Sequence, residues 1–182
     1  MAAFGGRRLA ALNRDALYVG LLFILTGLYL ALVSIAEAML GLGWSELWPG
    51  ILALAATALY LPLLVWWEQR EQFSVLALPA TILLANALLF LYSALTSDWN
   101  AWAYLWTLEL VALALGILLV WVIGPRDRAF LGIARAIGNV GLLLFAIFGI
   151  AFGSGLVRLL APIVLICLGL TFLIQNIGYL LR

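Results

Sequence analysis

Long runs of apolar residues, separated by short polar segments, make up most of the chain after residue 15. A helix needs about 20 apolar residues to cross a hydrocarbon layer about 30 Å thick, because each residue rises about 1.5 Å. The connections between the runs are too short to fold by themselves, so residues 1–182 are expected to form a single transmembrane domain. The pattern predicts an all-α integral membrane protein with six transmembrane helices, at residues 16–36, 47–66, 75–95, 101–123, 137–153 and 159–181.

The first apolar run has some features of a secretory signal peptide. Arg7, Arg8 and Arg14 precede it, and the small-residue sequence Ala36-Glu37-Ala38 follows it. The run is longer than the apolar region of a signal peptide, which has about 7–15 residues. We therefore expect it to remain in the protein as the first transmembrane helix.

Composition removes the water-soluble classes of protein. The chain is 68% apolar and 9% charged, and its mean hydropathy is +1.23, so it has too few polar residues to surround a soluble core. The formal net charge is only +1, which gives no reason to expect a nucleic-acid partner.

The residue types needed for most enzyme chemistry are missing. The sequence has no histidine to act as a base, no lysine to form a Schiff base, and a single cysteine, Cys167. No cluster of Cys and His has the spacing of a metal site. We therefore expect a protein that is not an enzyme and that has no cofactor and no bound metal.

The arginines predict the orientation in the membrane. With six spans, eight of the nine arginines fall on one side and only Arg158 falls on the other. Positive residues concentrate on the cytoplasmic side, so both termini are expected in the cytoplasm. Tryptophan is enriched at membrane interfaces, and four tryptophans on the opposite side are candidate interfacial anchors: Trp48, Trp99, Trp102 and Trp106.

The chain also shows an internal repeat. The sequence Leu47-Trp48-Pro49 aligns with Leu105-Trp106-Thr107 and with Leu160-Ala161-Pro162, each near the start of an even-numbered predicted helix. This alignment predicts three two-helix hairpin repeats, at about 16–66, 75–123 and 137–181, that together form a six-helix bundle.

Two short motifs carry a family resemblance. Gly-Leu-Leu-x-Ile-Leu-x-Gly begins at Gly20, and Trp-Pro-x-Ile-Leu begins at Trp48. With the tryptophan-rich segment that starts at Trp99, they resemble the LiaI/LiaF-like transmembrane-region family of multi-helix bacterial membrane proteins. The resemblance implies a multi-pass protein of the bacterial inner membrane with a role in envelope-stress signalling, by restraining a sensor kinase or recruiting a phage-shock-type partner. The chain is also similar, more weakly, to HdeD-like acid-resistance proteins, which have six helices in short repeats.

Three polar residues are candidates for an intramembrane site: Glu109, Asn86 and Arg158. Glu109 lies about eight residues inside the fourth predicted helix, roughly 12 Å below the interface, where a charge costs a few kcal/mol. It is a proton or cation site, a neutral side chain bonded to a neighbouring helix, or the partner of Arg158, whose stem can bend into the membrane. Asn86, near the middle of the third helix, is expected to bond across helices.

Two functions are compatible with these observations. The first is a non-enzymatic integral membrane scaffold, an accessory or regulatory subunit that contacts membrane lipids and binds another integral membrane protein or a second copy of itself. The alternative is a small transporter or channel that uses Glu109 in a proton or cation pathway. A transporter requires several polar residues to converge inside the bundle, and the sequence offers few.

Overall fold

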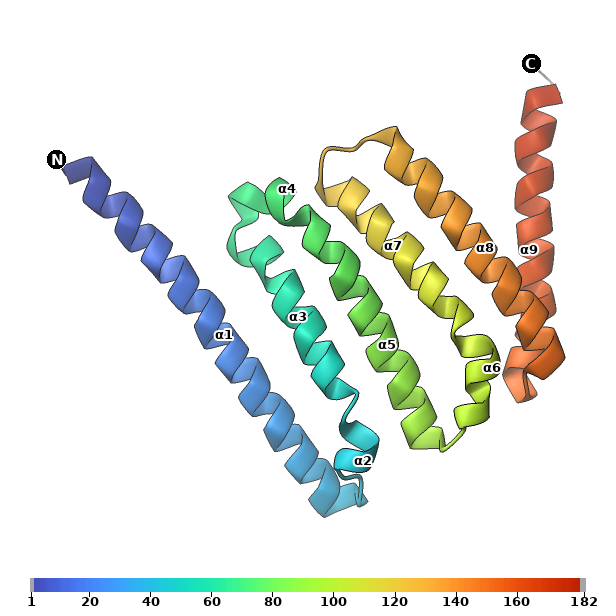
Figure 1. Ribbon diagram of the computed structural model, residues 1–182, viewed down its shortest axis with the longest axis horizontal. Coiled ribbons are helices and arrows are strands. Elements are labelled where there is room, and N and C mark those ends of the chain that lie inside the picture. Colours follow the sequence, from blue (N-terminus) through green and yellow to red (C-terminus); the bar gives the residue numbers. More distant parts are fainter. Residues whose placement is uncertain (1, 181–182) are drawn as a thin grey trace.

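The computed structural model describes the backbone of residues 2–180 and the side chains of residues 14–174 (Figure 1). The side chains of Arg7 and Arg8, in the predicted N-terminal flank, and of residues 175–181, in the predicted sixth span, lie outside the described part of the chain. All regular structure in residues 2–180 is helical, which confirms the prediction of an all-α chain. The helices are α1 (Ala2–Leu40), α2 (Trp44–Leu47), α3 (Gly50–Val65), α4 (Arg70–Phe73), α5 (Ala77–Thr96), α6 (Trp102–Leu105), α7 (Thr107–Ile123), α8 (Arg128–Phe152) and α9 (Gly155–Leu180), with short 3₁₀ turns at Trp67–Gln69, Ser74–Leu76 and Trp99–Ala101.

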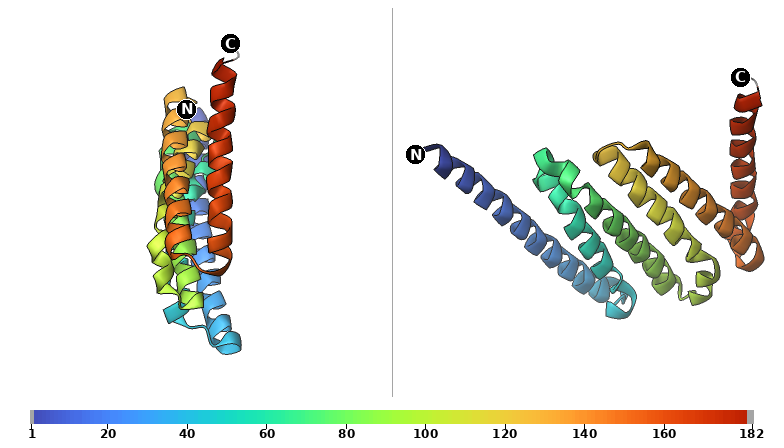
Figure 2. Two further views of the ribbon diagram at one scale, coloured as in Figure 1. Left: turned by 90° about the vertical axis from the view of Figure 1, so that its right-hand side faces the viewer. Right: turned by 45° about the horizontal axis from the view of Figure 1, so that its top comes forward.

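The longer helices run antiparallel, one beside the next in chain order, and form a single open row (Figure 1). Seen along the row, the helices overlap in a thin layer, with α9 standing to one side (Figure 2). Helix α1 packs mainly against α3, and α9 packs mainly against α8. Helices α1 and α9 form the rims of the row, and each has one principal neighbour. The arrangement is an open, layered form of a helical bundle.

Several helices could cross a membrane by length and composition. Four described segments meet this criterion, at Arg14–Leu40, Trp67–Thr96, Arg128–Phe152 and Gly155–Ile174. A fifth consists of Trp99–Leu105 and Thr107–Ile123, which meet at an angle of 52°. Helix α3 is apolar but has only 16 residues, about 24 Å of helix, which is shorter than the hydrocarbon layer.

Two of the predicted spans are interrupted, each near its start. In the span predicted at 47–66, the N–H of Ile51 donates to the Trp48 carbonyl at 3.0 Å, so a turn at Trp48 and Pro49 separates α2 from α3. In the span predicted at 101–123, the buried Thr107 hydroxyl donates to the Tyr104 carbonyl at 2.6 Å, where helix α7 begins. Helices α2 and α6 occupy aligned positions in the first two predicted repeats, whereas α9 is continuous.

Small residues bring the central helices close together. A Cβ on Gly141 of α8 would lie 2.9 Å from the Cβ of Leu110 on α7, and one on Gly116 of α7 would lie 3.1 Å from the Cα of Leu78 on α5. In membranes such close approach replaces the hydrophobic effect as the source of helix association. Packing between α7 and α8, which belong to different predicted repeats, is the most extensive in the protein.

Candidate functional site

Glu109 lies in the first turn of α7, immediately after the 52° bend that separates α7 from α6. Its side chain is partly buried, and its backbone N–H bonds the Trp106 carbonyl at 3.1 Å. A carboxylate in the first turn of a helix interacts favourably with the helix macrodipole. The sequence placed Glu109 inside a continuous helix, whereas the structure places it at the start of one.

The three polar candidates do not meet in one site. Arg158 is exposed near the start of α9, and within residues 14–174 the only ion pair shorter than 4.0 Å joins Arg14 to Glu68, so Glu109 and Arg158 are not paired. The Asn86 amide donates to the Ile82 carbonyl of its own helix at 3.1 Å, rather than across helices as expected.

Asn86 and Glu109 nevertheless lie at similar depth on adjacent helices. Helices α5 and α7 are antiparallel, and Gly116 lies against Leu78. Asn86 lies about two turns from Leu78 along α5, and Glu109 lies about two turns from Gly116 along α7. Both displacements run towards the bend between α6 and α7. The fold therefore places two partly buried polar residues at one level, without a described hydrogen bond between them.

Three of the four predicted tryptophan anchors surround one phenylalanine, Phe90 of α5. The ring centroid of Phe90 lies 5.2 Å from that of Trp48, 4.9 Å from Trp102 and 6.5 Å from Trp99. Trp106 instead contacts Phe148 of α8 at 5.7 Å. The three tryptophans around Phe90 therefore connect the α2–α3 turn, α5 and α6, on the side of the layer where α5 ends. The sequence interpretation did not single out Phe90, because nothing along the chain relates it to the three tryptophans.

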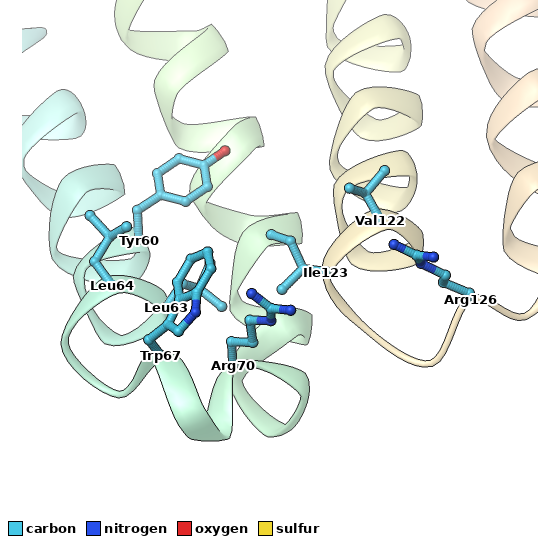
Figure 3. A pocket seen from close by; sticks show the side chains of 8 residues that line it. All are labelled: Tyr60, Leu63, Leu64, Trp67, Arg70, Val122, Ile123 and Arg126. Atoms are coloured by element: carbon cyan, nitrogen blue, oxygen red, sulfur yellow. The ribbon is translucent and has the colours of Figure 1, made fainter.

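A groove of about 490 Å³ opens at the opposite ends of the helices, on the side of the layer that carries the α3–α5 and α7–α8 connections (Figure 1). Figure 3 shows the side chains that line it. The end of α3 forms one wall and the end of α7 the other. The 3₁₀ turn after α3 and the first residue of α4 close the groove at its outer edge. Its lining residues are Tyr60, Leu63, Leu64, Trp67, Arg70, Val122, Ile123 and Arg126.

The floor of the groove is held by core packing and by hydrogen bonds. Buried Leu63 packs with Ala77 of α5 and Val120 of α7. The hydroxyls of Tyr60 and Thr81 lie 2.6 Å apart in a hydrogen bond that connects α3 to α5. These contacts join both walls of the groove to the start of α5, so the groove is part of the packed fold.

The end of α7 lies close to the segment that precedes α5. A Cβ on Gly124, at the end of α7, would lie 2.8 Å from the Ser74 hydroxyl oxygen and 2.7 Å from the Val120 carbonyl oxygen. Ser74 is itself buried and donates to the Glu71 carbonyl at 2.7 Å. A side chain at position 124 would therefore displace Ser74, and glycine lets the end of α7 lie against it.

Two arginines provide the charge of the groove. The Arg70 guanidinium lies 4.3 Å from the ring centroid of Trp67, a cation–π contact. Arg126 has a left-handed backbone, with φ of 53°, a conformation that is unfavourable for any residue but glycine or asparagine. Within residues 14–174, no carboxylate oxygen lies within 4.0 Å of either guanidinium. Sequence reasoning missed this groove, although Arg70 and Arg126 each follow the end of an apolar helix.

A larger crevice of about 730 Å³ lies on the opposite side of the layer from this groove, where α1 and α5 end. Its lining is entirely apolar and includes Leu32 and Met39 of α1 and Leu91 and Leu95 of α5. The crevice exists because α1 packs mainly on α3 and leaves the flank of α5 uncovered.

The part of the chain whose side chains are described contains no cluster suited to a metal ion. No group of three or more His, Cys, Asp and Glu side chains lies close enough there to hold a metal ion. No protein-family model, no curated protein and no solved structure matches this chain.

Proposed function

We propose that this protein is a non-enzymatic scaffold of the bacterial inner membrane, an accessory or regulatory subunit that binds another integral membrane protein. The open row of helices is the observation that carries the proposal. Large apolar side chains at its rims are exposed, including Phe23 and Met39 on α1, at 74% and 78%, and Leu159 on α9, at 70%. In a bilayer these surfaces face lipid or another protein.

The crevice between α1 and α5 is the surface best suited to a partner helix. Apolar exposure alone does not drive helices together in a membrane, because lipid tails cover it equally well. The crevice adds a shape that a helix can fit, because side chains of a partner helix that lies in it would gain van der Waals contacts with both walls. The residues that form its walls, such as Leu32 and Leu91, are apolar, so the matching helix surface would be apolar as well.

We infer six spans in three two-helix repeats, with Leu47 and α3 in one span across the turn, and α6 and α7 together in another. The start of α1 and the end of α9 lie on the same side of the layer of helices, as an even number of spans requires (Figure 1). Arg14, Arg70 and Arg126 belong to that side, which supports cytoplasmic termini. A role in envelope stress rests on the family resemblance.

The test is extraction of the tagged chain from its native membrane in mild detergent, followed by native mass spectrometry and identification of the proteins that travel with it. We expect a stoichiometric membrane-protein partner. Ala36→Trp, which fills the crevice, should release that partner. Leu143→Trp, at a 42% exposed position on α8, should retain it. A chain that leaves the membrane without another protein would contradict the accessory-subunit proposal.

A small transporter or channel is the second candidate, because Glu109 begins a helix at a bend. Broken helices that present polar groups inside the membrane are typical of transporter sites. In liposomes with a pH gradient, this proposal expects proton flux that Glu109→Gln abolishes and Glu37→Gln, at an exposed position on α1, preserves. Equal flux through the intact chain, Glu109→Gln and protein-free liposomes would contradict it.

A further inference from the structure

We propose that the groove between α3 and α7 binds one anionic phospholipid, with its phosphate at Arg70 and Arg126 and an acyl chain along the apolar wall. This inference goes beyond the scaffold function and does not depend on the identity of any protein partner.

The two guanidinium groups define the phosphate position. They point towards each other from opposite sides of the groove, Arg70 from the first turn of α4 and Arg126 from the loop after α7 (Figure 3). Two like charges that face each other without a counter-ion repel, and a phosphate between them removes that repulsion. The planar guanidinium also matches the geometry of phosphate oxygens, which it binds with two parallel hydrogen bonds.

The nearby carboxylates do not neutralise this pair. Glu68 is bonded to Arg14 at 3.2 Å. Asp127 accepts a hydrogen bond from the Ala129 backbone N–H at 2.9 Å and begins α8. Glu71 lines the neighbouring hollow but does not line the groove itself.

The groove has the two-part character of a phospholipid. A mainly polar hollow of about 310 Å³ adjoins it, and its lining includes Arg70 and Arg126, the loop residues Gly124 and Pro125, and one carboxylate, Glu71. Beyond the arginines the walls are apolar, and Leu64 and Val122 are 65% and 48% exposed, so the groove is open sideways to the hydrocarbon layer. A soluble phosphate would leave this apolar part uncovered, whereas an acyl chain fills it.

The position of the groove in the chain agrees with this ligand. Arg70 and Arg126 lie where apolar helices end, which is the level of lipid headgroups, and basic pockets between transmembrane helices bind anionic headgroups. Trp67 and Tyr60 provide the amphipathic rings that are typical of that level. The cation–π contact with Trp67 orients the Arg70 side chain before a ligand arrives, and the left-handed backbone at Arg126 sets the direction in which that side chain leaves the loop.

The experiment is a titration of the purified full chain in detergent with phosphatidylglycerol, phosphatidylcholine or inorganic phosphate, with the first bound ligand measured by native mass spectrometry. Phosphatidylglycerol should bind more tightly than phosphatidylcholine. Arg70→Gln and Arg126→Gly should each weaken phosphatidylglycerol binding about fivefold. Glycine suits the left-handed backbone at position 126, so Arg126→Gly removes the charge without a loss of folding. Arg128→Gln, an exposed arginine outside the groove, is the control.

A second variant tests the acyl-chain part of the site. Leu64→Trp fills the apolar wall and keeps both arginines, so it should weaken phosphatidylglycerol binding, whereas Leu143→Trp on α8 should not. Equal binding of the two lipids, or unchanged phosphatidylglycerol binding in the Arg70→Gln/Arg126→Gly double variant, would overturn the proposal. Displacement of the lipid by inorganic phosphate, with no effect of Leu64→Trp, would also overturn it and would identify a site for free phosphate.

Discussion

The Tyr18 hydroxyl of α1 donates a hydrogen bond of 3.2 Å to the Ala58 carbonyl of α3. Pro62 lies four residues after Ala58 and has no N–H, so this carbonyl lacks its usual helical donor. Water is not available inside a bilayer, and a neighbouring helix has to supply the missing donor. Tyr29 does the same at the α2–α3 break, where its hydroxyl donates to the Leu47 carbonyl at 2.6 Å. Helix α1 is thus attached at positions where the backbone of its neighbour is interrupted.

This relationship predicts that Tyr18→Phe lowers the free energy of unfolding by about 0.6–2 kcal/mol, because the Ala58 carbonyl loses its donor. In a Pro62→Ala background the same substitution should cost less, since the introduced alanine has a backbone N–H that can bond the Ala58 carbonyl. Reversible unfolding of the four proteins of this cycle in a bilayer or in mixed micelles measures the coupling. Equal costs of Tyr18→Phe in both backgrounds would show that the two residues are independent.

Gly50 predicts a second constraint on α1. A Cβ at this position would clash with the Tyr29 ring, which cannot move away without loss of its bond to Leu47. We expect Gly50→Ala to destabilise the protein by about 1–3 kcal/mol and to make α1 more susceptible to proteolysis. Gly20→Ala is the matched control, because a Cβ there meets nothing within 4 Å, and it should be neutral or stabilising. Similar effects of the two substitutions would contradict this explanation.

Phe90 should be a principal stabilising residue of the tryptophan-rich end. Phe90→Leu keeps an apolar side chain but removes the two closest ring contacts, to Trp48 and Trp102, which together are worth about 1–3 kcal/mol. Unfolding experiments measure the loss, and near-ultraviolet circular dichroism reports the changed environment of the tryptophans. Phe23→Leu on α1, where the side chain is 74% exposed, should leave both signals unchanged. If the two variants behave alike, Phe90 does not have this role.

Glu46 predicts a pH-dependent contribution from the segment between α1 and α3. The Ser45 hydroxyl donates to one carboxylate oxygen at 2.7 Å and the Gly43 backbone N–H to the other at 2.9 Å. These bonds, chiefly that from Ser45, hold the pKa of Glu46 below its ordinary value of 4.5. The stabilisation is therefore fully present above pH 4.5 and is lost as the pH falls through the lower pKa of the folded state.

Carbon-13 NMR of the Glu46 carboxyl measures this effect. Ser45→Ala should raise the pKa of Glu46 towards its ordinary value, and Glu46→Gln should remove the contribution of this group to the pH dependence of stability. A Glu46 carboxyl that titrates at or above pH 4.5 in the intact chain would contradict the assignment of these hydrogen bonds.

Much of the fold could be predicted because hydropathy follows directly from the chain. The runs at 75–95 and 159–181 correspond closely to α5 and α9. The breaks near Trp48 and Trp106 were missed, because continuous apolar composition conceals a local change in hydrogen bonding. The position of Glu109 was interpreted from that composition, and the structure moved it from a helix interior to a first turn. Asn86 was expected to bond across helices, but its amide donates to the Ile82 carbonyl of its own helix.

The sequence by itself determined that this is an all-helical chain with apolar segments suited to a membrane, because backbone groups in hydrocarbon must be satisfied within each segment. Only the tertiary structure decided which segments meet. Arg70 and Arg126 lie far apart along the chain and form one groove because α3 and α7 both pack on the start of α5. Trp48 and Trp102 share Phe90 for a similar reason. Such contacts depend on helix register and close backbone approach, which hydrophobic periodicity does not encode.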